Sequence, residues 1–262
     1  MGVGAYPWVA RASIRRYSTY RMATVGAVVE ASIASMIRAF VLLAAVHAVG
    51  TVRGLHPVQA ATYAFLAGAI DTSLQTMWPT DIDERIRTGE VIVDLQRPVD
   101  FQLWWFAHEA GRSAYMCVTR GIPSFLFGVL VLGIVVPGDV GAAALFTVSL
   151  GLAFVVAFAT RFLLSMSGFW LLDTRGTNSL VGAIITFSSG TLLPFAFFPE
   201  RVAHVMRVLP FAALVQTPFE VFTSSRPAAP ALASQAAWAV VLLLLGRAVL
   251  ARAVRRVVIQ GG

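Results

Sequence analysis

The chain has 262 residues, of which 58% are hydrophobic and only 13% are charged, with a formal net charge of +7. A soluble domain carries about 25% charged residues, so this chain lacks the charge needed to cover a globule in water. The composition argues against a soluble enzyme, a disordered chain and a disulfide scaffold, and it predicts an all-α polytopic membrane protein.

The arginines, the single cysteine and the histidines restrict the class of protein further. All 20 basic residues are arginine and lie at the ends of apolar runs, whereas a nucleic-acid-binding protein gathers them in a patch with interleaved aromatic residues. We therefore expect no nucleic-acid partner. The single cysteine permits no internal disulfide. The four histidines show no ligand spacing, so we expect no metal site.

The first predicted element covers residues 11–21 (RASIRRYSTYR). Ile14, Tyr17 and Tyr20 lie between its arginines, which is typical of an amphipathic helix on an anionic membrane surface. A solvated basic tail explains the pattern equally well. Membrane lipid is the partner expected of the helix.

Six apolar runs follow, each long enough to cross a hydrocarbon core of about 30 Å. Helices satisfy their own backbone hydrogen bonds in lipid, so we expect six transmembrane helices in one domain over residues 1–262. The runs cover residues 24–50, 57–78, 114–136, 140–164, 178–198 and 231–251.

The arginines predict the topology. They are concentrated in the N-terminal segment, in the loops after the second and fourth runs, and at the C-terminus. We assign Arg112 to the first of these loops and Arg161 to the second. The positive-inside rule therefore predicts that both termini are cytoplasmic, in a bacterial cell membrane.

Three charges lie inside predicted spans: Glu30 and Arg38 in the first, and Asp71 in the second. A central charge costs at least ~2.5–3.5 kcal/mol, so it should be paired or face water. Arg38 and Asp71 both lie roughly 18–21 Å below the outer surface on antiparallel neighbours, so we expect them to pair. The pair would either join the helices or line a substrate path, whereas Glu30 would lie near the cytoplasmic interface.

The longest cytoplasmic segment holds most of the acidic residues. DIDERIR, from Asp81, predicts a short helix that Thr88-Gly89 ends, and Arg97-Pro98 breaks the chain again. Residues 99–110 predict an interfacial helix that leads into the third span. A charged, capped helix held away from the membrane suits docking, with a solvated loop as the alternative.

The segment of about residues 189–225 is apolar but broken by four prolines. Its pieces are too short to cross a bilayer, so we expect an outer re-entrant hairpin that closes a pathway, or a surface hairpin without a gating role. The candidate outer gate comprises Pro194, Phe195, Phe198, Pro199, Pro210 and Phe211.

These two segments resemble those of permeases in the type-2 ATP-binding-cassette (ABC) exporter family. Residues 84–90 (ERIRTGE) and 95–99 (LQRPV) are similar to the coupling region of the family, and residues 189–218 to its proline-rich signature. Gln96 departs from the leucine usual there. Phe169-Trp170 is similar to a pattern in the subgroup with two different permease subunits.

The resemblance implies two permease subunits around a central path, each docking a cytoplasmic ABC ATPase. The chain lacks a G-x-x-x-x-G-K-[ST] loop, so we expect no enzyme activity and no cofactor in this chain, with ATP and Mg²⁺ on the partner ATPase. The expected coupling region, about residues 81–100, contributes Asp83, Glu84, Arg85, Arg87, Gly89, Glu90, Arg97 and Pro98.

The leading expectation for function is export of a hydrophobic or amphipathic small molecule, such as a drug or natural product. A lipid or glycan exporter or flippase of the same family, and a membrane anchor or regulator without a pathway, are the alternatives. An intramembrane enzyme is disfavoured, because the spans lack paired carboxylates, H-E-x-x-H and a Ser/His arrangement. Import or export, and homodimer or heterodimer, stay open.

Overall fold

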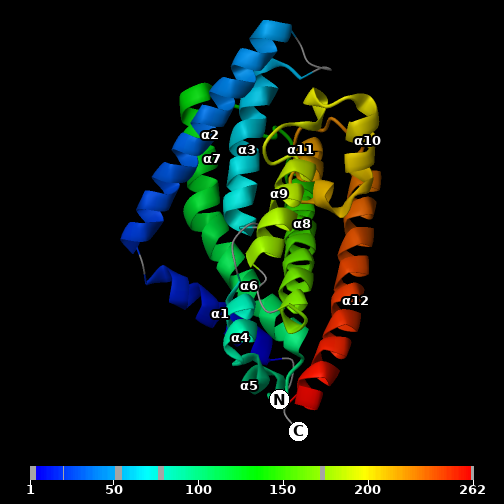
Figure 1. Ribbon diagram of the computed structural model, residues 1–262. Helices are drawn as coiled ribbons and strands as arrows, with labels where there is room; N and C mark the ends of the chain where they lie inside the picture. Colours follow the sequence, from blue (N-terminus) through cyan, green and yellow to red (C-terminus); the bar gives the residue numbers. More distant parts are fainter. Residues whose placement is uncertain (1–3, 20, 51–54, 76–79, 172–174, 261–262) are drawn as a thin grey trace.

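The computed structural model describes residues 4–19, 21–50, 55–75, 80–171 and 175–260, and these residues form helices and no strand (Figure 1). The all-α prediction is confirmed. The elements are α1 (Ala5–Ser18), α2 (Arg21–Val49), α3 (Pro57–Leu74), α4 (Asp81–Thr88), α5 (Val91–Leu95), α6 (Phe101–Met116), the π-helical turn η1 (Cys117–Gly121), α7 (Ile122–Leu132), α8 (Val140–Met166), the 3-10 turn η2 (Ser167–Phe169), α9 (Arg175–Ser188), the 3-10 turn η3 (Phe195–Phe197), α10 (Glu200–Val208), the 3-10 turn η4 (Pro210–Ala213), α11 (Gln216–Phe222) and α12 (Ala228–Gln260).

The bundle has two distinct ends. The start of α1 and the end of α12 lie at one end, together with α4 and α5, and we call this the termini end (Figure 1). The short helices α10 and α11 lie at the opposite end, which we call the far end (Figure 1). The charged segment and the proline-broken segment are therefore separated by the length of the bundle.

Four helical stretches in the described part of the chain are long and apolar enough to cross a membrane: Met22–Ala48, Phe101–Leu132, Val140–Phe169 and Ala228–Arg255. The helix predicted over residues 99–110 is present as the start of α6, and its interfacial position stays a prediction. α6, η1 and α7 form one continuous helix, Phe101–Leu132. Its 32 residues rise about 48 Å, more than a hydrocarbon core of about 30 Å needs, so the helix extends beyond the core.

The other two predicted spans differ from these four. α3 is buried on all sides from Ala60 to Ile70, among α2, α6, α7, α8 and α11, so it has little surface to present to lipid. α9 ends at Ser188 rather than at residue 198, because Gly190 turns the chain at φ +86° and Pro194 follows. Its 14 residues rise about 21 Å. The count of six crossings stays a prediction.

Small residues bring α2 and α3 together. The buried stripe of α2 recurs every three or four residues, and a β-carbon on Gly68 of α3 would overlap the hydroxyl oxygen of Ser35 on α2. The stripe consists of Ser32, Ser35, Ala39, Leu42 and Val46. The opposite face of α2 exposes large apolar side chains, as expected of a helix in lipid or against another subunit.

Prolines shape the far end as the sequence predicts. Pro199 immediately precedes α10, Pro210 begins η4, and Pro218 lies in the first turn of α11, where no intrahelical hydrogen bond is lost. We call the far-end segment, about residues 189–225, the cap. Phe195 is fully buried against Ala203 of α10, and these residues anchor a small apolar core of the cap. Re-entry of this segment into a membrane stays a prediction.

Candidate functional site

The charged segment at the termini end begins with a capped helix. Thr80 and Asp83 form a capping box, in which the Asp83 backbone N–H donates to Thr80 Oγ1 at 3.3 Å and the Thr80 N–H donates to Asp83 Oδ2 at 2.7 Å. Gly89, at φ +79°, ends α4 in the left-handed conformation that glycine adopts without strain. Acidic residues in the first turn and arginines in the last suit the helix dipole. The predicted helix and its stop are confirmed.

A buried carboxylate ties α4 to α5. Asp94 of α5 has a side chain only 3% exposed, and it accepts hydrogen bonds or ion pairs from Arg85 Nη1 at 2.9 Å and Arg97 Nη2 at 3.1 Å. Arg85 and Arg97, two of the expected coupling residues, therefore hold α4 and α5 together through Asp94, while their side chains stay 34% and 39% exposed. We call residues 81–97, with α4, α5 and this joint, the elbow.

Other expected coupling residues lie on the surface of the elbow. The side chains of Glu84 and Glu90 are 61% and 64% exposed, and Arg87 pairs with Glu84 on the same exposed face. The predicted set thus divides into residues that hold the elbow together and residues presented to solvent. Pro98 follows the elbow, outside any helix.

Apolar side chains attach the elbow to the bundle. Ile82 of α4 and Val91 of α5 are almost fully buried against Trp105 of α6 and against Phe158 and Met166 of α8. A force applied to the elbow would therefore reach α6 and α8 through close-packed side chains, which transmit strain.

Beside the elbow lies a cluster of buried charges that joins three helices. Glu109 Oε2 of α6 accepts from Arg112 Nη2 at 2.5 Å and from Arg161 Nη2 of α8 at 2.8 Å. Arg161 Nη1 also donates to the backbone oxygen of Gln75 at 3.1 Å, and Arg112 Nη1 donates to the Gln75 side chain. Gln75 is the C-cap of α3 at φ +46°. We call Gln75, Glu109, Arg112 and Arg161 the charge cluster.

The charge cluster continues to α4 and α1. His108 lies 3.8 Å from both Glu109 Oε1 and Asp81 Oδ2, and Arg16 of α1 donates to Asp81 Oδ2 at 2.6 Å. Burial raises the pKa of the Tyr17 phenol, and the Asp81 carboxylate raises it further, so Tyr17 stays neutral at physiological pH. Charges at this end are therefore linked from the N-terminal helix to the bundle interior.

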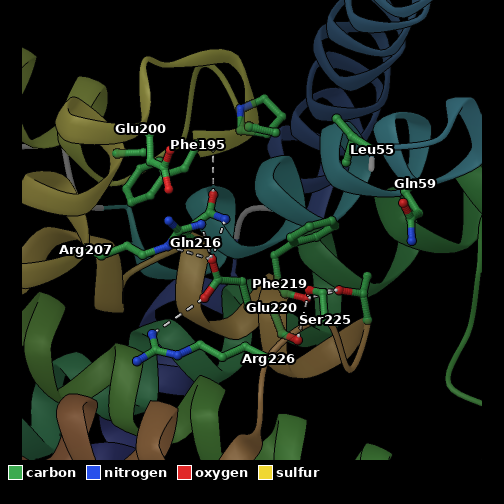
Figure 2. Close-up of a pocket in the computed structure, with 14 residues that line it drawn as sticks. Leu55, Gln59, Phe195, Glu200, Arg207, Gln216, Phe219, Glu220, Ser225 and Arg226 are labelled. Carbon is green, nitrogen blue, oxygen red and sulfur yellow. Dashed lines mark hydrogen bonds and ion pairs between the residues drawn. The ribbon is translucent and has the colours of Figure 1, made fainter. Parts of the chain in front are cut away.

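At the far end, the structure contains a cavity of about 680 Å³ (Figure 2). Of the predicted gate residues, Pro194 and Phe195 line it, whereas Phe198, Pro199, Pro210 and Phe211 do not. Phe198 instead packs edge-on against Phe187 of α9. The structure thus brings only part of the predicted gate to one place.

Polar side chains connect this cavity to α3. The Tyr63 hydroxyl lies 2.5 Å from the Gly190 oxygen and 3.2 Å from Gln216 Oε1. Gln216 Oε1 also accepts from the Phe195 backbone N–H at 3.2 Å, and Gln216 Nε2 donates to Glu220 Oε1 at 3.0 Å. Gln216 therefore joins the cap, the bundle and the charged side of the cavity.

A family model for ABC-2 family transporter proteins matches residues 32–261. The chain belongs to the ABC-2 transporter family. The match covers both the elbow and the far-end segment, and it confirms the resemblance to type-2 ABC permeases. Proteins of this family are multi-pass membrane subunits that work with a separate ATPase, generally in pairs. Neither the curated proteins nor the solved structures contain a match to the chain.

The three charges of the first two predicted spans lie on the neighbouring helices α2 and α3. Arg38 of α2 is half-buried, and its Nη1 is buried without a hydrogen-bond partner in the described part of the chain; that atom lies near Gly68, one turn from Asp71 on α3. Pairing of Arg38 with Asp71 stays a prediction. Glu30 is exposed at the termini end, where it lines a polar cavity of about 270 Å³ beside the charge cluster.

Sequence reasoning missed several site residues of the permease. Arg112 and Arg161 are not loop charges, because they lie inside α6 and α8 and are buried. The three-residue spacing of Glu109 and Arg112 was a signal for a helical pair. Gln216 and Glu220, four residues apart in an apolar segment, were the corresponding signal at the far end.

Proposed function

We propose that this chain is the permease subunit of a bacterial ABC transporter that exports a hydrophobic or amphipathic small molecule. The observation that carries the proposal is the elbow, a capped and charged helix pair held by Asp94 and packed on α6 and α8. A chain of the ABC-2 family needs such an element to receive force from its ATPase. In this proposal the termini end faces the cytoplasm.

The proposed mechanism is mechanical. ATP and Mg²⁺ bind the partner ATPase, and closure of the ATPase pushes the elbow. Ile82 and Val91 pass the displacement to α6 and α8, while the link from Asp81 through His108 to Glu109 engages the charge cluster. A small shift at this end becomes a rearrangement at the far end because packed helices move as rigid elements.

A second permease subunit is part of the proposal. α9 buries only a few of its side chains, and its remaining surface exposes both the polar Ser179 and the apolar Leu180, Ile184 and Phe187. A mixed surface of this kind suits a helix that faces a partner and a pathway better than one that faces lipid alone. The likeness at Phe169-Trp170 favours a different permease as the partner.

The far-end cap is proposed as the outer gate, with Pro194 and Phe195 as its inner wall. A lipid or glycan cargo, and a role as a non-transporting anchor, are the competing readings. Stimulation of the ATPase by candidate cargo distinguishes lipid or glycan export from small-molecule export. ATP-dependent transport in vesicles would exclude the role of a non-transporting anchor.

Charge reversal on the exposed face of the elbow tests the proposal. Glu84→Arg with Glu90→Arg should reduce recovery of an ABC ATPase with the tagged permease to less than about a tenth, because opposite-charge contacts become repulsive. Glu200→Arg reverses an exposed charge at the far end and is the matched control. Equal ATPase recovery from the elbow variant and the control would overturn the proposal.

A further inference from the structure

The far-end cavity has the size and lining of a ligand site. Its volume of about 680 Å³ lies within the range of small-molecule pockets, roughly 300–1,000 Å³. Phe195, Phe219 and Leu55 supply apolar wall, and two glutamates and two arginines supply charge (Figure 2). Apolar walls with a few converging polar groups are the usual composition of such pockets.

The two arginines keep hydrogen-bond donors that none of the described residues uses. Arg207 gives Nε and Nη2 to Glu220 Oε1, both at 3.3 Å, and Arg226 Nη1 lies 3.7 Å from Glu220 Oε2. A guanidinium has five N–H donors, and the described residues take no other hydrogen bond from these two. Both guanidiniums therefore have N–H groups available to a molecule in the cavity.

The carboxylate between them is fixed. The Glu220 side chain is 8% exposed and is held by Gln216, while the Arg207 and Arg226 side chains are 43% and 35% exposed. Two cations thus share one buried anion, which leaves one positive charge at the exposed side of the group. An incoming phosphate or carboxylate can take that charge by bidentate hydrogen bonds.

The remaining charge sets the ligand class. Glu200, in the first turn of α10, lines the same cavity and is exposed. The four charged side chains sum to zero, so a zwitterion leaves the cavity neutral, whereas a bare anion leaves it charged. We propose that the far-end cavity binds a zwitterionic amphiphile, with its phosphate or carboxylate on Arg207 and Arg226 and its ammonium group on Glu200.

Two sources offer this chemistry: the headgroup of a zwitterionic phospholipid, and a free zwitterion with an apolar side chain. Binding to the isolated permease, without ATPase, is measured by titration calorimetry with six-carbon-chain phosphatidylethanolamine for the first source and with phenylalanine for the second. Six-carbon-chain phosphatidylglycerol, which lacks the ammonium group, is the anionic comparison. Because no transport step is involved, the result is independent of the proposed function.

Three substitutions define the expected result. Arg207→Gln should weaken binding of the zwitterion about tenfold, as loss of a charge-assisted contact does. Arg201→Gln, next to Glu200 on α10 but outside the cavity, should leave binding unchanged. Glu220→Gln keeps an acceptor for Gln216 but frees a guanidinium charge, so it should shift preference toward the anionic lipid about fivefold or more.

The outcomes decide the proposal. Saturable binding of either zwitterion, weakened about tenfold in Arg207→Gln and unchanged in Arg201→Gln, supports it and identifies the source. It is overturned if neither zwitterion binds, or if binding is the same in all three variants. If the charges only hold the cap together, Arg207→Gln lowers the unfolding temperature and Glu220→Gln does not change the lipid preference, which also overturns it.

Discussion

Asp94 is the residue on which the elbow depends. It lies between two guanidiniums that come from opposite ends of the segment, nine residues before it and three residues after it. A carboxylate buried in this way contributes through its two charge-assisted bonds, each worth roughly 1.5–3 kcal/mol. Neither partner is visible from the sequence of α5 alone.

Asp94→Asn should loosen the elbow without unfolding the bundle. The amide cannot neutralise Arg85 and Arg97, which then repel each other, so backbone amides of α4 and α5 should exchange hydrogen faster, by about tenfold or more. Hydrogen–deuterium exchange of the purified permease measures this. Glu84→Gln, which removes an exposed charge from the same segment without contacting Arg85 or Arg97, should leave exchange unchanged. Protection of α4 and α5 that is equal in Asp94→Asn and the wild type would contradict this role.

Glu109 is a buried carboxylate between two arginines inside the bundle, as Asp94 is in the elbow. Glu109→Ala leaves Arg112 and Arg161 buried with no carboxylate between them, which costs about 3–5 kcal/mol when one partner of a buried pair is removed. The midpoint of thermal or denaturant unfolding should therefore fall markedly. Glu30→Ala is the control, because Glu30 is exposed and lines the same polar cavity of about 270 Å³ as Glu109. A midpoint within error of the control would show that the cluster does not stabilise the fold.

At the scale of elements, local signals predicted local structure. Thr80 with Asp83, and Gly89, fix both ends of α4 through contacts within a few residues, so the sequence was sufficient there. A helix leading into the third span was predicted, but the uninterrupted apolar stretch from Phe101 was not, because its first part carries His108, Glu109 and Arg112, which read as cytoplasmic. Their partners lie on α3, α4 and α8, and only the tertiary structure brings those elements together.

The exposed surface of α9 leads to a prediction about the second permease. A photocrosslinking amino acid at Leu180, whose side chain is largely exposed on α9, should form an adduct with a permease-sized protein in native membranes. The same group at Leu244, similarly exposed on α12, should react mainly with lipid. Gel mobility and mass spectrometry identify the adduct. Adducts from Leu244 but none from Leu180 would mean that α12, and not α9, faces the partner subunit.

At the scale of the whole molecule, two charged sites lie at opposite ends. The elbow and charge cluster occupy the termini end, the far-end cavity and cap occupy the far end, and long helices join them (Figure 1). This arrangement follows from helices that alternate in direction, which the apolar runs predicted. It allows a motor at one end to act on a cap at the other.

Photocrosslinking from α4 in intact membranes measures whether the elbow contacts an ATPase. A crosslinker at Arg87, exposed on the elbow, should form an adduct with an ABC ATPase, and the adduct yield should change when ATP and Mg²⁺ are added. A crosslinker at His204, exposed on α10 at the far end, should give no such adduct. An ATPase adduct from His204, or none from Arg87 in membranes that contain the ATPase, would contradict the account.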